Sequence, residues 1–238
     1  MEARILGWAG VELRGTTTVV IDPLADAGAV WAAAGDLARG VPLPPVVPPE
    51  PGAAAAGLLT HLHRDHADAA ALAAALAPGA PVFGPEPFGG GDVEQAAVAH
   101  AEHELRAAGL ELVPVRAWET VEAGEWSFTA LPAVDGTGDP QVSWLVTGAG
   151  ATVLHAGDTL SHGWWWRIAQ RAPGGIDVAF LPINAPRVAF PHSAVQIRPK
   201  GKWCCTREGF TDRHHMSAAS LFWLSAQDLV FRTNSSAI

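Results

Sequence analysis

The feature that most constrains this chain is a histidine and aspartate cluster at residues 60–66, Thr-His-Leu-His-Arg-Asp-His. An apolar run precedes the cluster, and the alanine-rich segment 67–76 that follows it is typical of a helix. These flanks predict a strand that enters a loop, with a helix beginning on its far side. Side chains alternate between the two faces of an extended chain, so His61, His63 and Asp65 are expected to project to the same side.

The turn into the helix would bring His66 toward the same pocket. Three imidazoles and a carboxylate within six residues are ligand types that zinc and other borderline divalent cations take. A lone His-X-His is usually a surface or capping feature, but the complete pattern between a strand and a helix favours metal binding. Asp65 has a second interpretation as the N-cap of the helix, and one residue could serve in both roles.

The His-X-His-X-Asp-His pattern at 61–66 resembles the signature of the metallo-β-lactamase superfamily of metal-dependent hydrolases. Segments 4–13 and 18–23 resemble the opening hairpin of that family, with its Asp at a strand end. Residues 153–159 resemble the later strand whose terminal Asp bridges two metals. The similarity extends over about residues 4–192 and is nearest to small lactonase-like and phosphodiesterase-like members.

This resemblance implies an α+β fold, a four-layer αββα sandwich of two mixed β-sheets flanked by helices. We expect a metallo-β-lactamase-like domain over residues 1–192 and an atypical tail over 193–238, which could leave the C-terminal part of the fold incomplete. Both lysines and both cysteines lie in the tail, and no linker precedes it. Our hypothesis is a shifted reading frame or an unrelated fusion that packs badly, which sequencing the DNA near codon 192 tests.

The resemblance also implies two metal ions, zinc in the first place, with manganese or iron as alternatives. The implied ligands are His61, His63, Asp65, His66, Asp135 and Asp158. Asp135 stands where the family usually has a histidine, and a carboxylate is an acceptable ligand for these metals; its alternative is a turn residue before Gly136. Asp158 would bridge the two cations, and its alternative is a helix cap.

Four further residues concern the same centre. In the resembled family a histidine near the C-terminus completes the second metal site; His214 and His215 stand at about the right distance but lack a preceding strand, so we interpret them as coincidental. We interpret His192 as a loop residue near the pocket. Asp22 either orients a ligand histidine through its far ring nitrogen or forms a turn, and the resemblance favours the first role.

Composition bears on partners and location. The chain has 238 residues, 49% of them hydrophobic, enough for a globular core. It has no apolar run of the length of a membrane span and no signal-peptide pattern, so we expect a cytoplasmic protein without a membrane partner. A formal charge of −9 makes nucleic acid an unlikely partner. The tryptophans at 164–166 would line a pocket or the face of a homo-oligomer.

Two segments carry predictions about the scaffold. The proline-rich part of residues 24–52 forbids helix, and we expect a loop around the edge of the fold, with a pocket wall as the alternative. Short strands between residues 110 and 131 are expected to form one β-meander.

The expected activity is hydrolysis of an ester, lactone or phosphodiester bond of a small-molecule substrate by a metal-bound hydroxide. Asp65 is the expected catalytic residue, because it could orient the hydroxide or pass its proton to the leaving group. The alternative is a degenerate, non-catalytic metal-binding member of the same fold, which Asp135 and the tail both favour.

Overall fold

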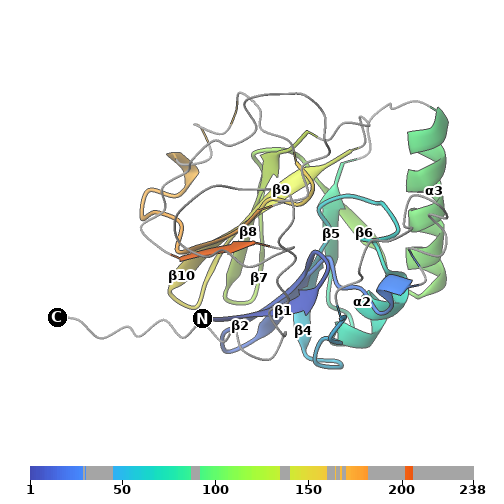
Figure 1. Ribbon diagram of the computed structural model, residues 1–238, viewed down its shortest axis with the longest axis horizontal. Helices are drawn as coiled ribbons and strands as arrows, with labels where there is room; N and C mark the ends of the chain where they lie inside the picture. The colour runs from blue at the N-terminus through green and yellow to red at the C-terminus, as the bar shows by residue number, and fades with distance from the viewer. Residues whose placement is uncertain are drawn as a thin grey trace, which may run out of the picture.

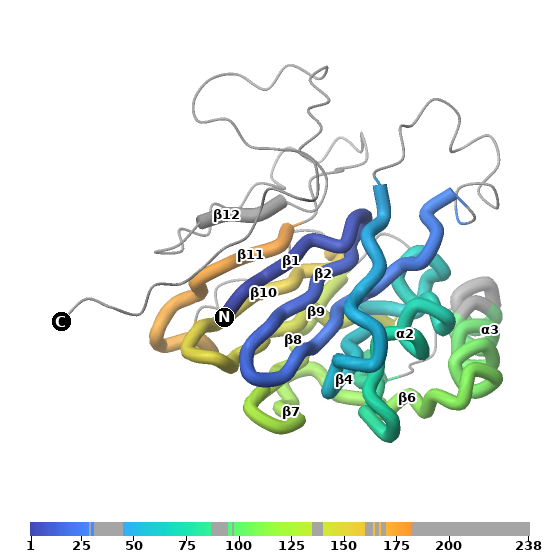
Figure 2. Tube along the Cα trace, turned by 90° about the horizontal axis from the view of Figure 1, so that it is seen from below, coloured from blue at the N-terminus to red at the C-terminus, as the bar shows by residue number. Residues whose placement is uncertain are grey.

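Two mixed β-sheets face each other in this computed structural model (Figures 1 and 2). The structure describes residues 1–28, 30, 45–86, 92–134, 140–159, 164, 167, 170–181 and 202–205. The first sheet contains, in spatial order, β1 (Glu2–Gly7), β2 (Gly10–Arg14), β3 (Thr18–Ile21), β4 (Ala54–Leu58), β5 (Val82–Pro85) and β6 (Leu112–Val115). The second contains β12 (Lys202–Cys205), β11 (Val178–Leu181), β10 (Ala151–His155), β9 (Val142–Gly148), β8 (Trp126–Pro132) and β7 (Thr120–Ala123).

Each sheet is buried on both of its faces. The side chains that alternate along each strand pack into different buried clusters. In β3, Val19 and Ile21 belong to the core between the sheets, while Val20 packs on the outer, helix-covered side. The second sheet contributes Trp126 and Trp144 to the central core, and both are fully buried. Two mixed sheets with this packing confirm the predicted fold class.

Helices α2 (Ala69–Ala75) and α3 (Asp92–Ala107) cover the outer face of the first sheet. Asp68 caps α2, because its side chain accepts from the backbone N–H groups of Ala70 and Ala71. The capping interpretation of Asp65 is therefore wrong: residues 63–67 form a separate turn that delays the helix beyond it. Within the described residues, no helix is long and apolar enough to span a membrane.

The predicted meander between residues 110 and 131 is wrong in one respect. Strand β6 pairs in parallel with β5 of the first sheet, whereas β7 pairs antiparallel with β8 of the second. The chain thus crosses between the sheets after β6, through a turn in which Trp118 has a φ of +75°. Pro114 fits the edge position of β6, because an edge strand needs fewer backbone donors.

The described part of the proline-rich segment runs along β1, as the loop prediction requires. The Val47 N–H donates to the Leu6 carbonyl at 2.6 Å, and Arg4 donates to the Pro48 carbonyl at 3.2 Å. This loop covers Glu12, which is fully buried on the face of β2 that points away from the central core. Residues 31–44 lie outside the described residues.

Glu12 joins β1, β2 and the proline-rich loop through its carboxylate. It accepts from the side chains of Arg4 and Arg14 and from the Glu50 backbone N–H. Burial alone would raise the pKa of Glu12, but these hydrogen bonds outweigh it and lower the pKa. The ionised carboxylate is therefore a stabilising group of the folded chain.

Glu12→Gln should lower the free energy of unfolding by about 2 kcal/mol at neutral pH, because it breaks a buried, hydrogen-bonded ion pair. A lowered pKa gives full stabilisation above the unfolded pKa of about 4.3, and the contribution is lost as pH falls through the folded pKa. The difference in free energy of unfolding between wild type and variant should therefore become smaller in acid. Urea unfolding at several pH values would measure it. Glu122→Gln, on an exposed strand position, should leave stability unchanged.

Candidate metal centre

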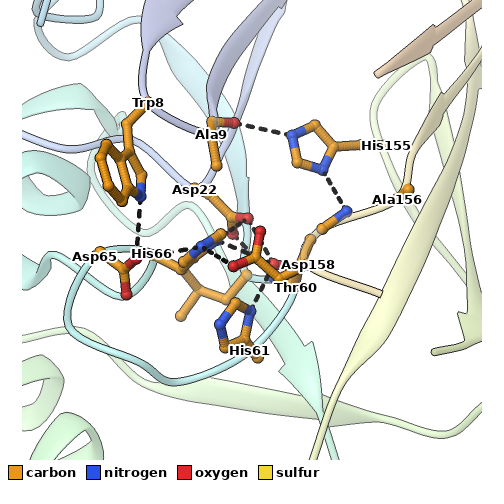
Figure 3. A network of polar contacts seen from close by, with 12 residues as sticks. Trp8, Ala9, Asp22, Thr60, His61, Asp65, His66, His155, Ala156 and Asp158 are labelled. Atoms are coloured by element: carbon orange, nitrogen blue, oxygen red, sulfur yellow. Dashed lines mark hydrogen bonds and ion pairs between the residues drawn. The ribbon is translucent and has the colours of Figure 1, made fainter. Parts of the chain in front are cut away.

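The histidine and aspartate cluster lies at the carboxyl ends of neighbouring strands. Residues 59–68 connect β4 to α2, and Asp22 follows β3, the parallel neighbour of β4. Asp158 follows β10 of the second sheet, and the isolated bridge between His61 and Gln141 joins the two sheets at this place. Figure 3 shows these side chains converging from both sheets.

Five of the six predicted ligands meet in two overlapping groups. One ligand atom from each of His61, His63 and Asp65 lies within 4.8 Å of the others, and the same holds for His61, His66 and Asp158. His61 belongs to both groups, with its ring centroid 4.6 Å from that of His63 and 4.0 Å from that of His66. The sixth, Asp135, lies outside the described residues, as do His192, His214 and His215.

Asp22 and Thr60 fix which nitrogen of each buried ring carries the proton. The Asp22 carboxylate accepts from the Thr60 backbone N–H at 2.8 Å and from its hydroxyl at 2.6 Å. It also lies 2.8 Å from Nδ1 of His66, which must donate to it. The Thr60 hydroxyl has given its only hydrogen to Asp22, so Nδ1 of His61, 3.1 Å away, donates to the hydroxyl oxygen.

The two Nε2 atoms are consequently left to face the centre. Both are buried, and neither has a hydrogen-bond partner among the described residues. Nε2 of His66 lies 3.7 Å from Asp65 Oδ2 and 3.6 Å from Asp158 Oδ2, too far for hydrogen bonds. Buried polar atoms are nearly always satisfied, so two unsatisfied imidazole nitrogens beside carboxylates fit a divalent cation.

The charges around the centre favour a cation. Burial lowers the pKa of His66, but Asp22 and Asp158 outweigh this effect and raise the pKa well above its usual value. Burial raises the pKa of Asp158, but His66 outweighs it and holds the pKa well below the usual range. Burial and the neighbouring imidazoles lower the pKa of His61, which disfavours its protonated form. The acidic side chains thus draw positive charge to His66, as a proton or as a cation that displaces it, while His61 offers a neutral nitrogen.

Gly157 brings Asp158 close to this network. Its φ is +62°, and a Cβ atom there would lie 2.8 Å from Cβ of Thr60, closer than real contacts allow. The second sheet can therefore approach the Thr60–Asp22 pair only with glycine at this position.

The sequence anticipated the role of Asp22 but not that of Thr60. It also did not indicate Trp8, whose indole N–H donates to Asp65 Oδ2 at 3.1 Å. The position of Thr60 directly before the cluster was the available signal. For Trp8, far away in the sequence, only its place between Gly7 and Gly10 hinted at a turn.

Comparison with known families gives a match to the Beta-lactamase superfamily domain over residues 17–219. The chain belongs to the metallo-β-lactamase superfamily. The matched range includes the first part of the segment from residue 193, and the domain boundary at 192 stays a prediction. The described histidine and aspartate cluster lies within the matched range.

Solved structures support the same fold. CmlA, a diiron β-hydroxylase from Streptomyces venezuelae, is 20% identical with a TM-score of 0.52, and the match covers 76% of this chain and 34% of CmlA. A candidate metal-dependent hydrolase from Parabacteroides distasonis is 18% identical with a TM-score of 0.50, with 77% and 70% covered. This chain thus spans about a third of CmlA. No curated protein sequence matches it.

Proposed function

We propose that this chain is a hydrolase that uses two divalent cations, zinc in the first place, to cleave an ester, lactone or phosphodiester bond of a small molecule. The observation that carries the proposal is the pair of buried Nε2 atoms of His61 and His66, both without a hydrogen-bond partner among the described residues. Asp65 and Asp158 stand beside them, so the donor set combines imidazole and carboxylate as zinc, manganese and iron sites do.

The roles of the protein groups follow from their positions. A bound divalent cation would act as a Lewis acid that lowers the pKa of water and polarises the target oxygen. Asp22 and Thr60 keep His61 and His66 in the tautomer that presents Nε2. Asp65 has a side chain that is 24% exposed, so it can reach solvent and pass a proton to a leaving oxygen.

Elemental analysis of the purified full chain, paired with a panel of ester, lactone and phosphodiester probes, tests this proposal. We expect about two zinc ions per chain, loss of hydrolysis after dialysis against a chelator, and recovery when zinc is returned. Stoichiometric metal without turnover of any probe would support the alternative, a non-catalytic metal-binding member. A chain that takes up no metal on reconstitution would contradict both.

We also propose a cytoplasmic location, a small-molecule substrate and assembly as a homo-oligomer. The acidic net charge of −9 supports a partner other than nucleic acid. Trp164, which packs against Trp118 and has 44% of its surface exposed, supports an apolar contact at this place.

A further inference from the structure

The short turn between β1 and β2 reaches into the metal centre. Trp8 in this turn has a φ of +53°, a left-handed conformation that is rare for a bulky aromatic residue. In this conformation its indole N–H points at the Asp65 carboxylate and donates to Oδ2 at 3.1 Å (Figure 3). A strained backbone at a functional site is retained only where the surrounding structure holds it.

The other side of the same turn is held by the second sheet. The Ala9 carbonyl oxygen lies 2.9 Å from Nε2 of His155, and Nδ1 of His155 accepts from the Gly157 backbone N–H at 3.3 Å. With Nδ1 acting as an acceptor, the proton of the neutral ring is on Nε2, which donates to Ala9. His155 is buried and directly precedes the loop to Asp158. The turn between β1 and β2 is therefore held both to Asp65 and to the loop that carries Asp158.

We propose that Trp8 is a positioning residue for Asp65: its indole N–H holds the carboxylate beside His61 and His63. Asp65 is the carboxylate of its ligand group and its side chain is 24% exposed, so without a partner it would sample several rotamers. A ligand held in place before the cation arrives loses less conformational entropy on binding. The inference rests on the metal-binding part of the proposed function and is independent of the substrate.

Trp8→Phe tests this directly. Phenylalanine keeps an aromatic ring and the same left-handed backbone cost, but it removes the N–H donor. Loss of a hydrogen-bond partner behind a metal ligand typically costs about 10- to 100-fold in metal affinity. We expect that decrease for Zn²⁺, measured on the full chain by competition with a chromophoric chelator, with circular dichroism as the check of folding.

Trp126→Phe is the matched control. It also removes an indole hydrogen bond, from Nε1 to the Thr17 hydroxyl at 2.8 Å, but Thr17 precedes β3 whereas Asp22 follows it. The control therefore acts at the opposite end of the strand and should leave zinc affinity unchanged, whatever it does to stability.

A double-mutant cycle separates positioning from a structural role. In an Asp65→Ala background, Trp8→Phe should cause no further loss of zinc affinity, because the group through which Trp8 acts is gone. Wild-type affinity in Trp8→Phe, or an equal loss in both backgrounds, would overturn the inference while leaving the proposed function intact. Absence of zinc binding by the wild-type chain would overturn both.

A second measurement does not depend on the Trp8 variant folding. The chain has ten tryptophans, and with ¹⁵N-labelled tryptophan one indole N–H resonance should shift when Asp65 is replaced by alanine. The same resonance should shift when zinc is added to the wild-type chain. Indole spectra that are unchanged by Asp65→Ala would reject the hydrogen bond and the inference with it.

Discussion

Replacing His61 with alanine should remove bound metal from both ligand groups and bring hydrolysis close to the uncatalysed rate. His61 is the one described residue shared by the two groups, so its loss leaves each of them with two ligands. Lewis-acid catalysis supplies several kcal/mol of transition-state stabilisation, which corresponds to a decrease in kcat/KM of about 10³-fold or more. Zinc content by elemental analysis and initial rates on the same preparation are the measurements.

His103→Ala provides the control for this substitution. His103 is exposed on α3 and belongs to neither ligand group, so metal content and activity should remain at wild-type values. If His61→Ala retained full zinc content, the buried Nε2 atom would not be a ligand and the proposed centre would be wrong. A chain that kept its zinc but lost activity would limit His61 to a role in catalysis.

Asp22→Asn should weaken zinc binding by about 10- to 100-fold, although Asp22 belongs to neither ligand group. The asparagine amide would present N–H groups where the carboxylate now accepts from Thr60 and His66. Nδ1 of His66 would then have to accept, which moves its proton to Nε2 and blocks the lone pair that faces the centre. Buried donors left without an acceptor should also lower the free energy of unfolding by about 2–3 kcal/mol.

The backbone makes Asn the informative substitution at this position. Asp22 has a φ of +45°, which asparagine tolerates about as well as aspartate, so the variant isolates the carboxylate. Asp26→Asn is the matched control, because Asp26 accepts a hydrogen bond from the Gly28 N–H in an exposed turn. Chelator competition and urea unfolding should separate the two variants. Equal zinc affinity in Asp22→Asn and wild type would show that the tautomer of His66 is set by something else.

The sequence was most informative where chemistry and spacing are local. The ligand cluster occupies six consecutive positions, so the alternation of an extended chain followed by a turn was enough to bring its side chains together. The alanine-rich segment 67–76 was predicted as a helix, and α2 lies within it at Ala69–Ala75. For Asp22 the residues left two roles open and the resemblance favoured orienting a histidine; its carboxylate indeed lies 2.8 Å from Nδ1 of His66.

Long-range contacts and small shifts of register were not readable from the sequence. Trp8 meets Asp65 across 57 positions, and nothing local marks that hydrogen bond. The capping residue was misplaced because Asp65 and Asp68 are both plausible caps, and only the turn at residues 63–67 decides between them. The crossing after β6 depends on which sheet offers a free edge, a property of the whole fold and not of the segment.

The two ligand groups differ in how much of the chain must be folded before they exist. His61, His63 and Asp65 come from one loop of five residues, and Trp8, which holds Asp65, lies in a turn of the same sheet, so this group requires only the first sheet. The group of His61, His66 and Asp158 requires strands separated by more than ninety residues to be docked. Metal bound to the group of His61, His66 and Asp158 would therefore show that the two sheets have docked. Metal bound to the other group would not show this.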